Sequence, residues 1–219
     1  FYLNGYVNDM GKTDLNLNFF LKFLIKWSTG ILLHDDFLAN KMDINKDGFR
    51  DLPTGNLFSI MNRWHYDDNK GWKIQFGFKV LNDNKTGGEN TFASKDKFTT
   101  NVYGFGMNIE REEGYAKIGY IFPEKKYKSI GLQVSASSFK QHSFFGITPY
   151  DGTQKSIYSN LIYQSIIGNT DHTFRTGISF SSDSYDEMYA ANFYHRNEIV
   201  PGAFLEYSYK KNKIKIFLQ

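Results

Sequence analysis

The sequence contains no cysteine among its 219 residues. This absence excludes disulfide bonds, zinc sites with thiolate ligands and cysteine nucleophiles. Long apolar runs are missing as well, and none approaches the roughly 20 residues that a membrane-spanning helix requires. The formal net charge of +3 is too small to indicate a nucleic-acid-binding protein, so we expect no nucleic acid among the partners.

Enzyme signatures are also missing. There is no G-x-S-x-G elbow and no P-loop, and Gly104-Phe105-Gly106 lies inside a predicted strand instead of opening a helix. No two histidines have H-x-x-H or H-E-x-x-H spacing, and we interpret each as a polar residue of a wet interior or a loop: His34, His65, His142, His172 and His195. We therefore expect no enzymatic activity and no catalytic residues.

Aromatic residues, by contrast, are abundant: they make up 18% of the chain, with 21 Phe and 15 Tyr. They recur in an alternating pattern. It is clearest at residues 72–80, where apolar residues alternate with polar residues and glycine: Trp72, Ile74, Phe76, Phe78 and Val80. Alternation with a period of two places one set of residues on each face of a strand. Long strands with an apolar and a polar face are typical of a transmembrane β-barrel, which is apolar toward lipid and polar toward its lumen.

The alternation predicts strands along most of the chain. From Leu15 to Trp27 every odd position is apolar, and we favour a strand there over a helix because neighbouring segments alternate too. Further strands are predicted at residues 29–35, 57–66, 71–82, 99–111, 115–122, 128–139, 155–167, 171–182, 186–195, 200–210 and 213–219. We expect residues 1–219 to form a single segment of an all-β fold, an antiparallel meander forming part of a transmembrane β-barrel.

The predicted connections differ in length. Short turns are expected at residues 67–71, 112–114 and 210–213, where Gly, Asn, Asp, Glu or Lys gather. Long polar loops are expected at residues 39–55 and 82–97, and the acidic residues Asp183, Asp186 and Glu187 are interpreted as a loop tip. Short turns on one side and long loops on the other are typical of outer-membrane barrels.

One loop contains a potential cation site. Asp43, Asn45, Asp47 and Gly48 match the first half of the calcium loop, D-x-[DN]-x-[DN]-G. Oxygens at its first, third and fifth positions converge on Ca²⁺, the glycine permits the sharp turn, and the carbonyl of Phe49 follows as a ligand. Asp51 stands at position nine, where a ligand often acts through water, whereas Thr54 replaces the bidentate acid of position twelve. An Asx-rich turn without an ion is the alternative.

Three stretches together resemble a known family. They are Met42–Pro53, then Asn62-Arg63-Trp64 through Trp72–Val80, then Glu198–Tyr209. In order, they are similar to the middle of the barrel in TonB-dependent outer-membrane receptors of the Bacteroidetes type. The resemblance implies uptake of a scarce ligand, such as ferric siderophore, cobalamin or glycan, through a plugged barrel in the outer membrane, with outer-membrane lipid around it.

The chain also departs from that family. The plug domain and the segment that contacts TonB are not recognised in it, and about a dozen predicted strands are half of the family's barrel. We therefore expect an internal piece of such a barrel, with TonB as a partner only through the missing N-terminal part. Two alternatives stay open: a soluble all-β, calcium-stabilised carbohydrate-binding module, and a small porin-like barrel with its own pore.

Overall fold

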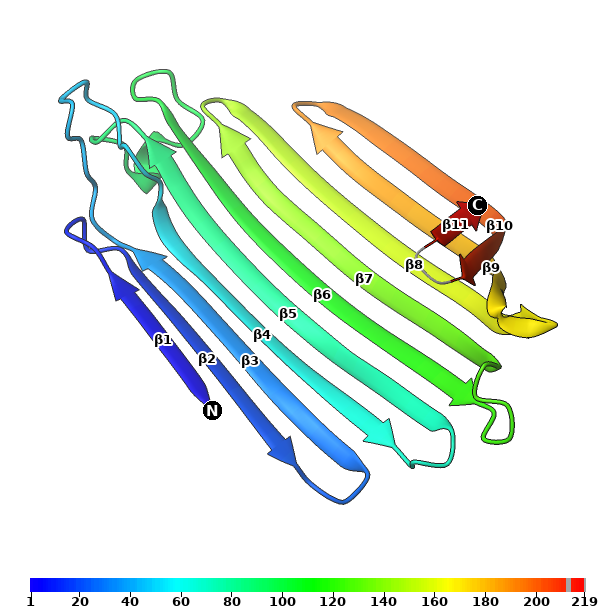
Figure 1. Cartoon of the computed structure of the whole chain (residues 1–219). Helices are drawn as coiled ribbons and strands as arrows, with labels where there is room; N and C mark the ends of the chain where they lie inside the picture. Colours follow the sequence, from blue (N-terminus) through cyan, green and yellow to red (C-terminus); the bar gives the residue numbers. More distant parts are fainter. Residues whose placement is uncertain (212–213, 219) are drawn as a thin grey trace.

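The structure, a computed structural model, describes residues 1–211 and 214–218 and forms one antiparallel sheet (Figure 1). Its 11 strands lie side by side in chain order, so the fold is an all-β meander. The strands are β1 (Tyr2–Val7), β2 (Thr13–Lys22), β3 (Trp27–Leu38), β4 (Thr54–Asp67), β5 (Trp72–Gly88), β6 (Gly104–Ile121), β7 (Ser129–Phe145), β8 (Thr148–Ile167), β9 (Asn169–Tyr189), β10 (Asn192–Lys211) and β11 (Ile214–Leu218). The described residues contain no α-helix, only the 3₁₀ turn η1 (Ser94–Asp96). None of their helical segments is long and apolar enough to cross a membrane.

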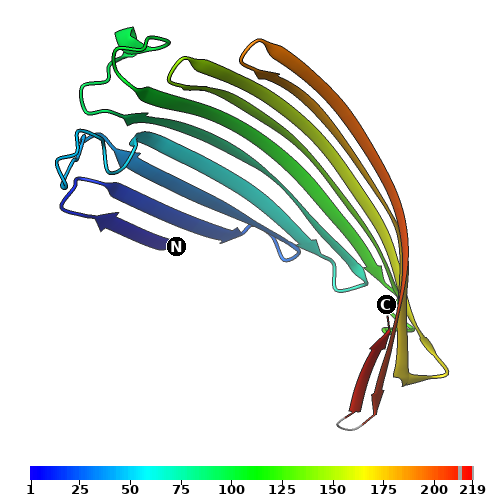
Figure 2. The same ribbon diagram turned by 90° about the horizontal axis from the view of Figure 1, so that it is seen from above.

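The sheet is a single curved layer (Figure 2). Among the described residues no pairing joins β1 to β11, so the sheet is not closed. Its accessible surface is 14469 Å², about 40% more than a compact monomer of this mass is expected to expose. The buried apolar side chains of the described part are Leu38, Phe92 and Phe144, which lie close to the long loops. The middle of the sheet therefore has no second layer of the same chain against it.

One side of the sheet, here the apolar face, carries a continuous apolar band across nine strands. The strand register aligns the apolar-face residues of β5 with those of β4 and β6. Phe76, for example, lies between Trp64 and Ala116. The band consists of Leu15, Leu17, Phe19, Leu21, Ile31, Leu33, Ile60, Trp64, Ile74, Phe76, Phe78, Val80, Ala116, Ile118, Ile130, Leu132, Val134, Ile157, Leu161, Ile178, Phe180, Ile199, Ala203 and Leu205. Many of these side chains are exposed, Phe78 to 57% and Leu205 to 63%.

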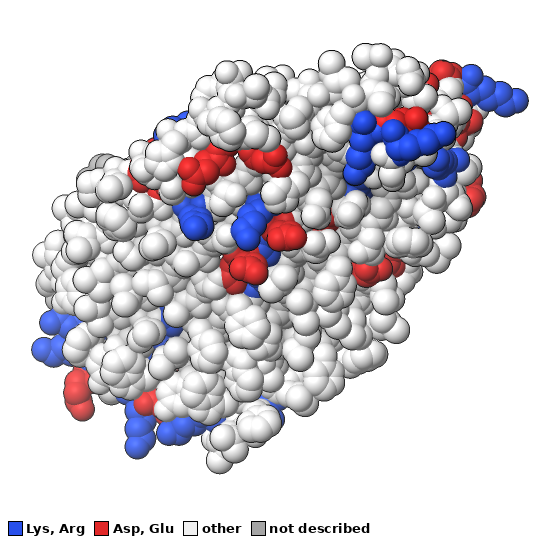
Figure 3. Space-filling model, turned by 180° about the vertical axis from the view of Figure 1, so that it is seen from behind, with Lys and Arg blue, Asp and Glu red and all other residues white. Residues whose placement is uncertain are grey.

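Figure 3 shows a matching distribution of charge on one side of the molecule. Lys, Arg, Asp and Glu gather near the strand ends and in one group within the sheet, and a broad area between them carries none. The register gives this arrangement for the apolar face, whose charged residues follow the apolar band toward one end of the strands. They are Asp35, Glu110, Glu112, Lys140, Lys155, Asp151 and Asp186.

The opposite side, here the polar face, is rich in serine, glutamine and glycine. Several of its glycines lie under aromatic rings from neighbouring strands. A Cβ on Gly30 would be 2.7 Å from ring atoms of Phe20, and a Cβ on Gly177 would be 2.5 Å from Cε1 of Phe204. The rings therefore lie across the strands instead of standing upright, which keeps this face shallow.

The two ends of the sheet differ. At the short-turn end, the connections are residues 23–26, 68–71, 122–128 and 168. At the long-loop end, the connections include residues 39–53 and 89–103, together with tight turns at residues 146–147 and 190–191. The prediction of short turns at one end and long loops at the other is thus confirmed, although two of the turns at the long-loop end are also tight.

Most predicted strands lie within observed strands, but several predicted boundaries are wrong. Residues 112–114 are not a turn: they lie inside β6, where Glu113 pairs with Lys79. The predicted strand at 186–195 is divided by a turn at Ala190, which has a φ of 54°. The strand expected to reach Trp27 ends at Lys22, and the strand expected from residue 99 begins at Gly104. The turn predicted at 210–213 includes residues 212 and 213, which lie outside the described residues.

The acidic residues expected at a loop tip are also placed differently. Asp183, Asp186 and Glu187 lie inside β9, paired with both β8 and β10. β5 likewise continues to Gly88, so the loop predicted to begin at residue 82 begins at residue 89. These errors share a cause: toward the long-loop end the strands extend past the apolar band, both faces become polar, and the alternation that identifies a strand disappears.

Candidate functional site

Aromatic residues border the apolar band at its short-turn end. Trp27 packs on Tyr66 with ring centroids 4.8 Å apart, and Trp72 packs on Tyr120 at 4.9 Å. Register places all four on the apolar face. On later strands the row continues with Tyr163, Phe174, Tyr207, His172 and Tyr209. Rings with one polar atom favour the boundary between an apolar and a wet environment.

In the Asn62-Arg63-Trp64 stretch, the side-chain amide of Asn62 lies within the apolar band and is fully hydrogen-bonded. The Nδ2 of Asn62 donates to Thr29 Oγ1 and to the Gly30 carbonyl, each at 3.1 Å. Its Oδ1 accepts the indole N–H of Trp64 at 2.8 Å. Because these bonds occupy both ends of the amide, Asn62 can lie on an apolar surface without an unpaired polar group.

The predicted calcium loop is a tight set of Asx turns between β3 and β4. Asp43 Oδ1 and Asn45 Oδ1 both accept the Asp47 N–H, at 3.1 and 3.2 Å, so these two oxygens face the same point. Asp47 Oδ1 accepts the Phe49 N–H at 2.8 Å, while Gly48, with a φ of 88°, completes the turn. Asp51 also accepts from the backbone of this loop, with the Ile44 N–H donating to its Oδ2 at 2.7 Å.

This loop is anchored to the 89–103 loop. Asn90 donates to Asp43 Oδ2 at 2.8 Å, and the backbone of Phe49 forms an isolated bridge with Glu89. The Arg50 guanidinium donates to the carbonyl of Phe92 at 2.9 Å, and burial lowers the pKa of Arg50. The two loops thus form one cap at the long-loop end of the sheet.

The side-chain oxygens of the loop are of the type that a hard cation prefers, but they are too few to complete its coordination. Asp43, Asn45 and Asp47 offer the carboxylate and amide oxygens that Ca²⁺ prefers. However, no group of three or more His, Cys, Asp or Glu side chains in the described part of the chain is arranged to hold a metal ion. Any ion would therefore depend on Asn45, on backbone carbonyls and on water, and Ca²⁺ needs six to eight oxygens.

Charge on the polar face is divided between its two ends. The half toward the short-turn end carries mainly bases: Lys22, Arg63, Lys73, Lys117, Arg175 and Lys210. The half toward the long-loop end carries most of the acids: Asp14, Asp36, Asp83, Glu113, Asp183, Glu187 and Glu198. In that acidic half Lys85, Arg111 and Arg196 form ion pairs, Lys85 with Asp36 at 3.3 Å.

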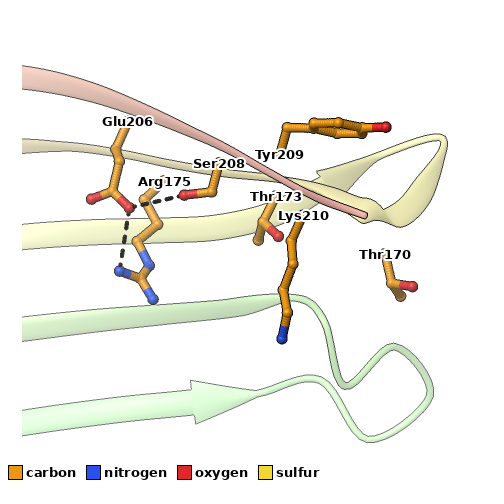
Figure 4. A pocket seen from close by; sticks show the side chains of 7 residues that line it. All are labelled: Thr170, Thr173, Arg175, Glu206, Ser208, Tyr209 and Lys210. Carbon is orange, nitrogen blue, oxygen red and sulfur yellow. Dashed lines mark hydrogen bonds and ion pairs between the residues drawn. The ribbon is translucent and has the colours of Figure 1, made fainter. Parts of the chain in front are cut away.

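A small cavity of about 250 Å³ lies at the basic end, between β9 and β10 (Figure 4). Arg175 contacts Glu206 at 3.5 Å and donates from Nε to Gln164 Oε1 at 2.8 Å. Figure 4 shows Arg175 and Lys210 pointing to one side of the strands and Tyr209 to the other. This is the division between polar and apolar faces that the register gives.

The histidines occupy both faces, and the sequence did not reveal their partners. His34 and His65 lie on the polar face. His142 contacts Asp151 at 2.5 Å on the apolar face beyond the apolar band, and His195 contacts Asp186 there at 2.6 Å. Each His–Asp pair joins neighbouring strands, so it becomes recognisable only once the register is known.

No family model, no curated protein and no solved structure matches this chain.

Proposed function

We propose that this chain forms part of the wall of an outer-membrane β-barrel, with the apolar face toward lipid and the polar face toward the lumen. The observation that carries the proposal is the apolar band on a single-layer sheet. The nine residues from Trp72 to Val80 span about 26 Å along the strand, close to the roughly 25 Å lipid-facing band of such barrels. The aromatic row at the edge of the band supports the same placement.

A soluble sandwich accounts for these features less well. In a sandwich, a second sheet packs on the apolar face at about 10 Å and buries it. Here that face has no covering layer among the described residues, and Phe78 is more than half exposed. Water would face a patch far larger than the few hundred Å² that soluble monomers tolerate. Contact with lipid in place of water removes the free-energy cost of exposing this apolar patch.

We further propose that the barrel is a TonB-dependent receptor for a scarce ligand. Support comes from the motif resemblance and from the open edges of the sheet. β1 and β11 are the edge strands, and unpaired N–H and C=O groups on an edge are not tolerated in lipid. Further strands, or a second copy of the sheet, would have to complete the wall. A small porin-like barrel would instead require the two edges to pair with each other.

The loop at residues 43–51 is proposed as a weak Ca²⁺ site of structural role. Asp43, Asn45 and Asp47 would supply side-chain oxygens, the Phe49 carbonyl a backbone oxygen, and Asp51 a ligand through water. Their hydrogen bonds to backbone N–H groups already order the loop, so the ion would add rigidity to the cap and no chemistry.

The membrane proposal is tested by two neighbouring substitutions. An arginine on the lipid face near the midplane costs about 2–4 kcal/mol, whereas one facing the lumen stays hydrated. Phe76→Arg should therefore block folding into outer membranes, measured by heat-modifiable migration, while the control Gln75→Arg should fold. Equal behaviour of the two variants, or a monodisperse wild-type monomer without detergent, would exclude the membrane barrel.

A further inference from the structure

Two neighbouring hollows on the polar face have the character of an anion-binding site. The first, of about 410 Å³, is lined by Lys22, Arg63, His65 and Gln75 among others. The second, of about 230 Å³, shares His65 and Gln75 with the first and adds Lys73, Lys117 and Gln133. The second hollow opens over Gly119 and Gly131, which carry no side chain and have no ring over them.

The basic groups around these hollows are largely uncompensated. Lys73 is paired with Asp67. In the part of the chain that the structure describes, Lys22, Arg63 and Lys117 have no carboxylate oxygen within 4.0 Å. Arg63 instead lies over the ring of Phe20, with 5.3 Å from its Cζ to the ring centroid. That contact holds the guanidinium in place and leaves its N–H donors available.

The surrounding donors are complementary to oxyanions. Lysine and arginine bind phosphate and carboxylate, arginine in a bidentate manner. Gln75 and Gln133 add neutral amide donors between the bases. Acids are concentrated in the other half of this face, so the field along the strands favours an anion at the short-turn end. Three cations that are not balanced by acids match a ligand with more than one negative charge.

We propose that the paired hollows bind a compact, multiply charged oxyanion, carrying phosphate or carboxylate groups, between Arg63 and Lys117. The site goes beyond the proposed wall function, because its residues share the polar face whether or not the opposite face meets lipid. The charge-bearing side chains come from β2, β4, β5 and β6. The site therefore depends on the register of these strands, not on any single motif.

The test is calorimetric titration of the purified 219-residue chain with pyrophosphate and, separately, with citrate, in low salt. We expect saturable binding of at least one of them, and the stronger ligand distinguishes phosphate from carboxylate recognition. Lys117→Gln should weaken binding about two- to fivefold, as for one exposed ion pair. Lys117→Arg should restore it. The matched control is Lys155→Gln, which removes the same charge from the other face of the sheet and should change nothing.

Two results would overturn the proposal. One is the absence of saturable heat for both anions at millimolar concentration. The other is an equal loss of affinity in Lys155→Gln and Lys117→Gln, which would mean attraction to overall charge only. Both readouts are independent of membrane insertion. If the wild-type chain proves soluble without detergent yet binds an anion, the membrane proposal fails and this one stands.

Discussion

The ring of Phe20 lies across Gly30 on the neighbouring strand, and the guanidinium of Arg63 lies over the same ring. Phe20 and Gly30 are register partners of β2 and β3. A Cβ on Gly30 would stand 2.7 Å from Cδ1 and Cε1 of the ring. This contact covers a stretch of strand that has no side chain of its own, which stabilises the pairing.

Gly30→Ala should therefore destabilise the sheet by about 1–3 kcal/mol, the usual cost of a methyl group forced into occupied space. Gly114→Ala is the matched control, because a Cβ there meets nothing within 4 Å. Denaturant unfolding in detergent measures both variants. Phe20→Leu should relieve part of the Gly30→Ala loss, and purely additive effects would show that the ring is not the obstacle.

The indole N–H of Trp64 should contribute to the stability of the sheet in addition to the apolar area of the ring. Trp64→Phe leaves Oδ1 of Asn62 without its donor on an apolar surface, at a cost of about 1–3 kcal/mol. Trp72→Phe serves as a control, since the Trp72 ring packs against Tyr120 at the border of the band. Unfolding midpoints compare the two variants. A smaller loss for Trp64→Phe than for Trp72→Phe would contradict the role assigned to the Asn62 bond.

Much of the sheet can be predicted from the sequence wherever its two faces differ. The alternation around Phe76 and Phe78 predicts the strand and the set of residues on its apolar face, because one residue in two is apolar. Beyond the band this constraint is lost. Glu113 and Asp183 look like loop residues, and only pairing with both neighbouring strands shows that they belong to the sheet.

The candidate sites were predictable to different degrees. The Asx turns formed by Asp43, Asn45 and Asp47 are local in sequence, so the sequence motif predicts them. The hollows between Arg63 and Lys117 join residues more than 50 positions apart, and nothing local indicates that they share a face. Strand register alone brings them together.

Calcium should bind the 43–51 loop weakly, because Thr54 stands where a bidentate acid would otherwise close the coordination. Titration with Ca²⁺ should give heat that Asp47→Ala abolishes. Asp96→Ala, in the second loop of the cap, is the matched control and should leave the heat unchanged. Identical wild-type and Asp47→Ala isotherms up to millimolar Ca²⁺ would show that this loop does not bind the ion.

The central claim, that the apolar face meets lipid and the polar face meets water, is tested most directly by adjacent labels on β5. The chain has no cysteine, so Phe78→Cys and Lys79→Cys each carry a single environment-sensitive fluorophore. In reconstituted membranes, we expect brominated lipid to quench the label at residue 78 and aqueous iodide to quench the label at residue 79. Equal quenching of both labels by iodide, with no effect of brominated lipid at residue 78, would contradict the account.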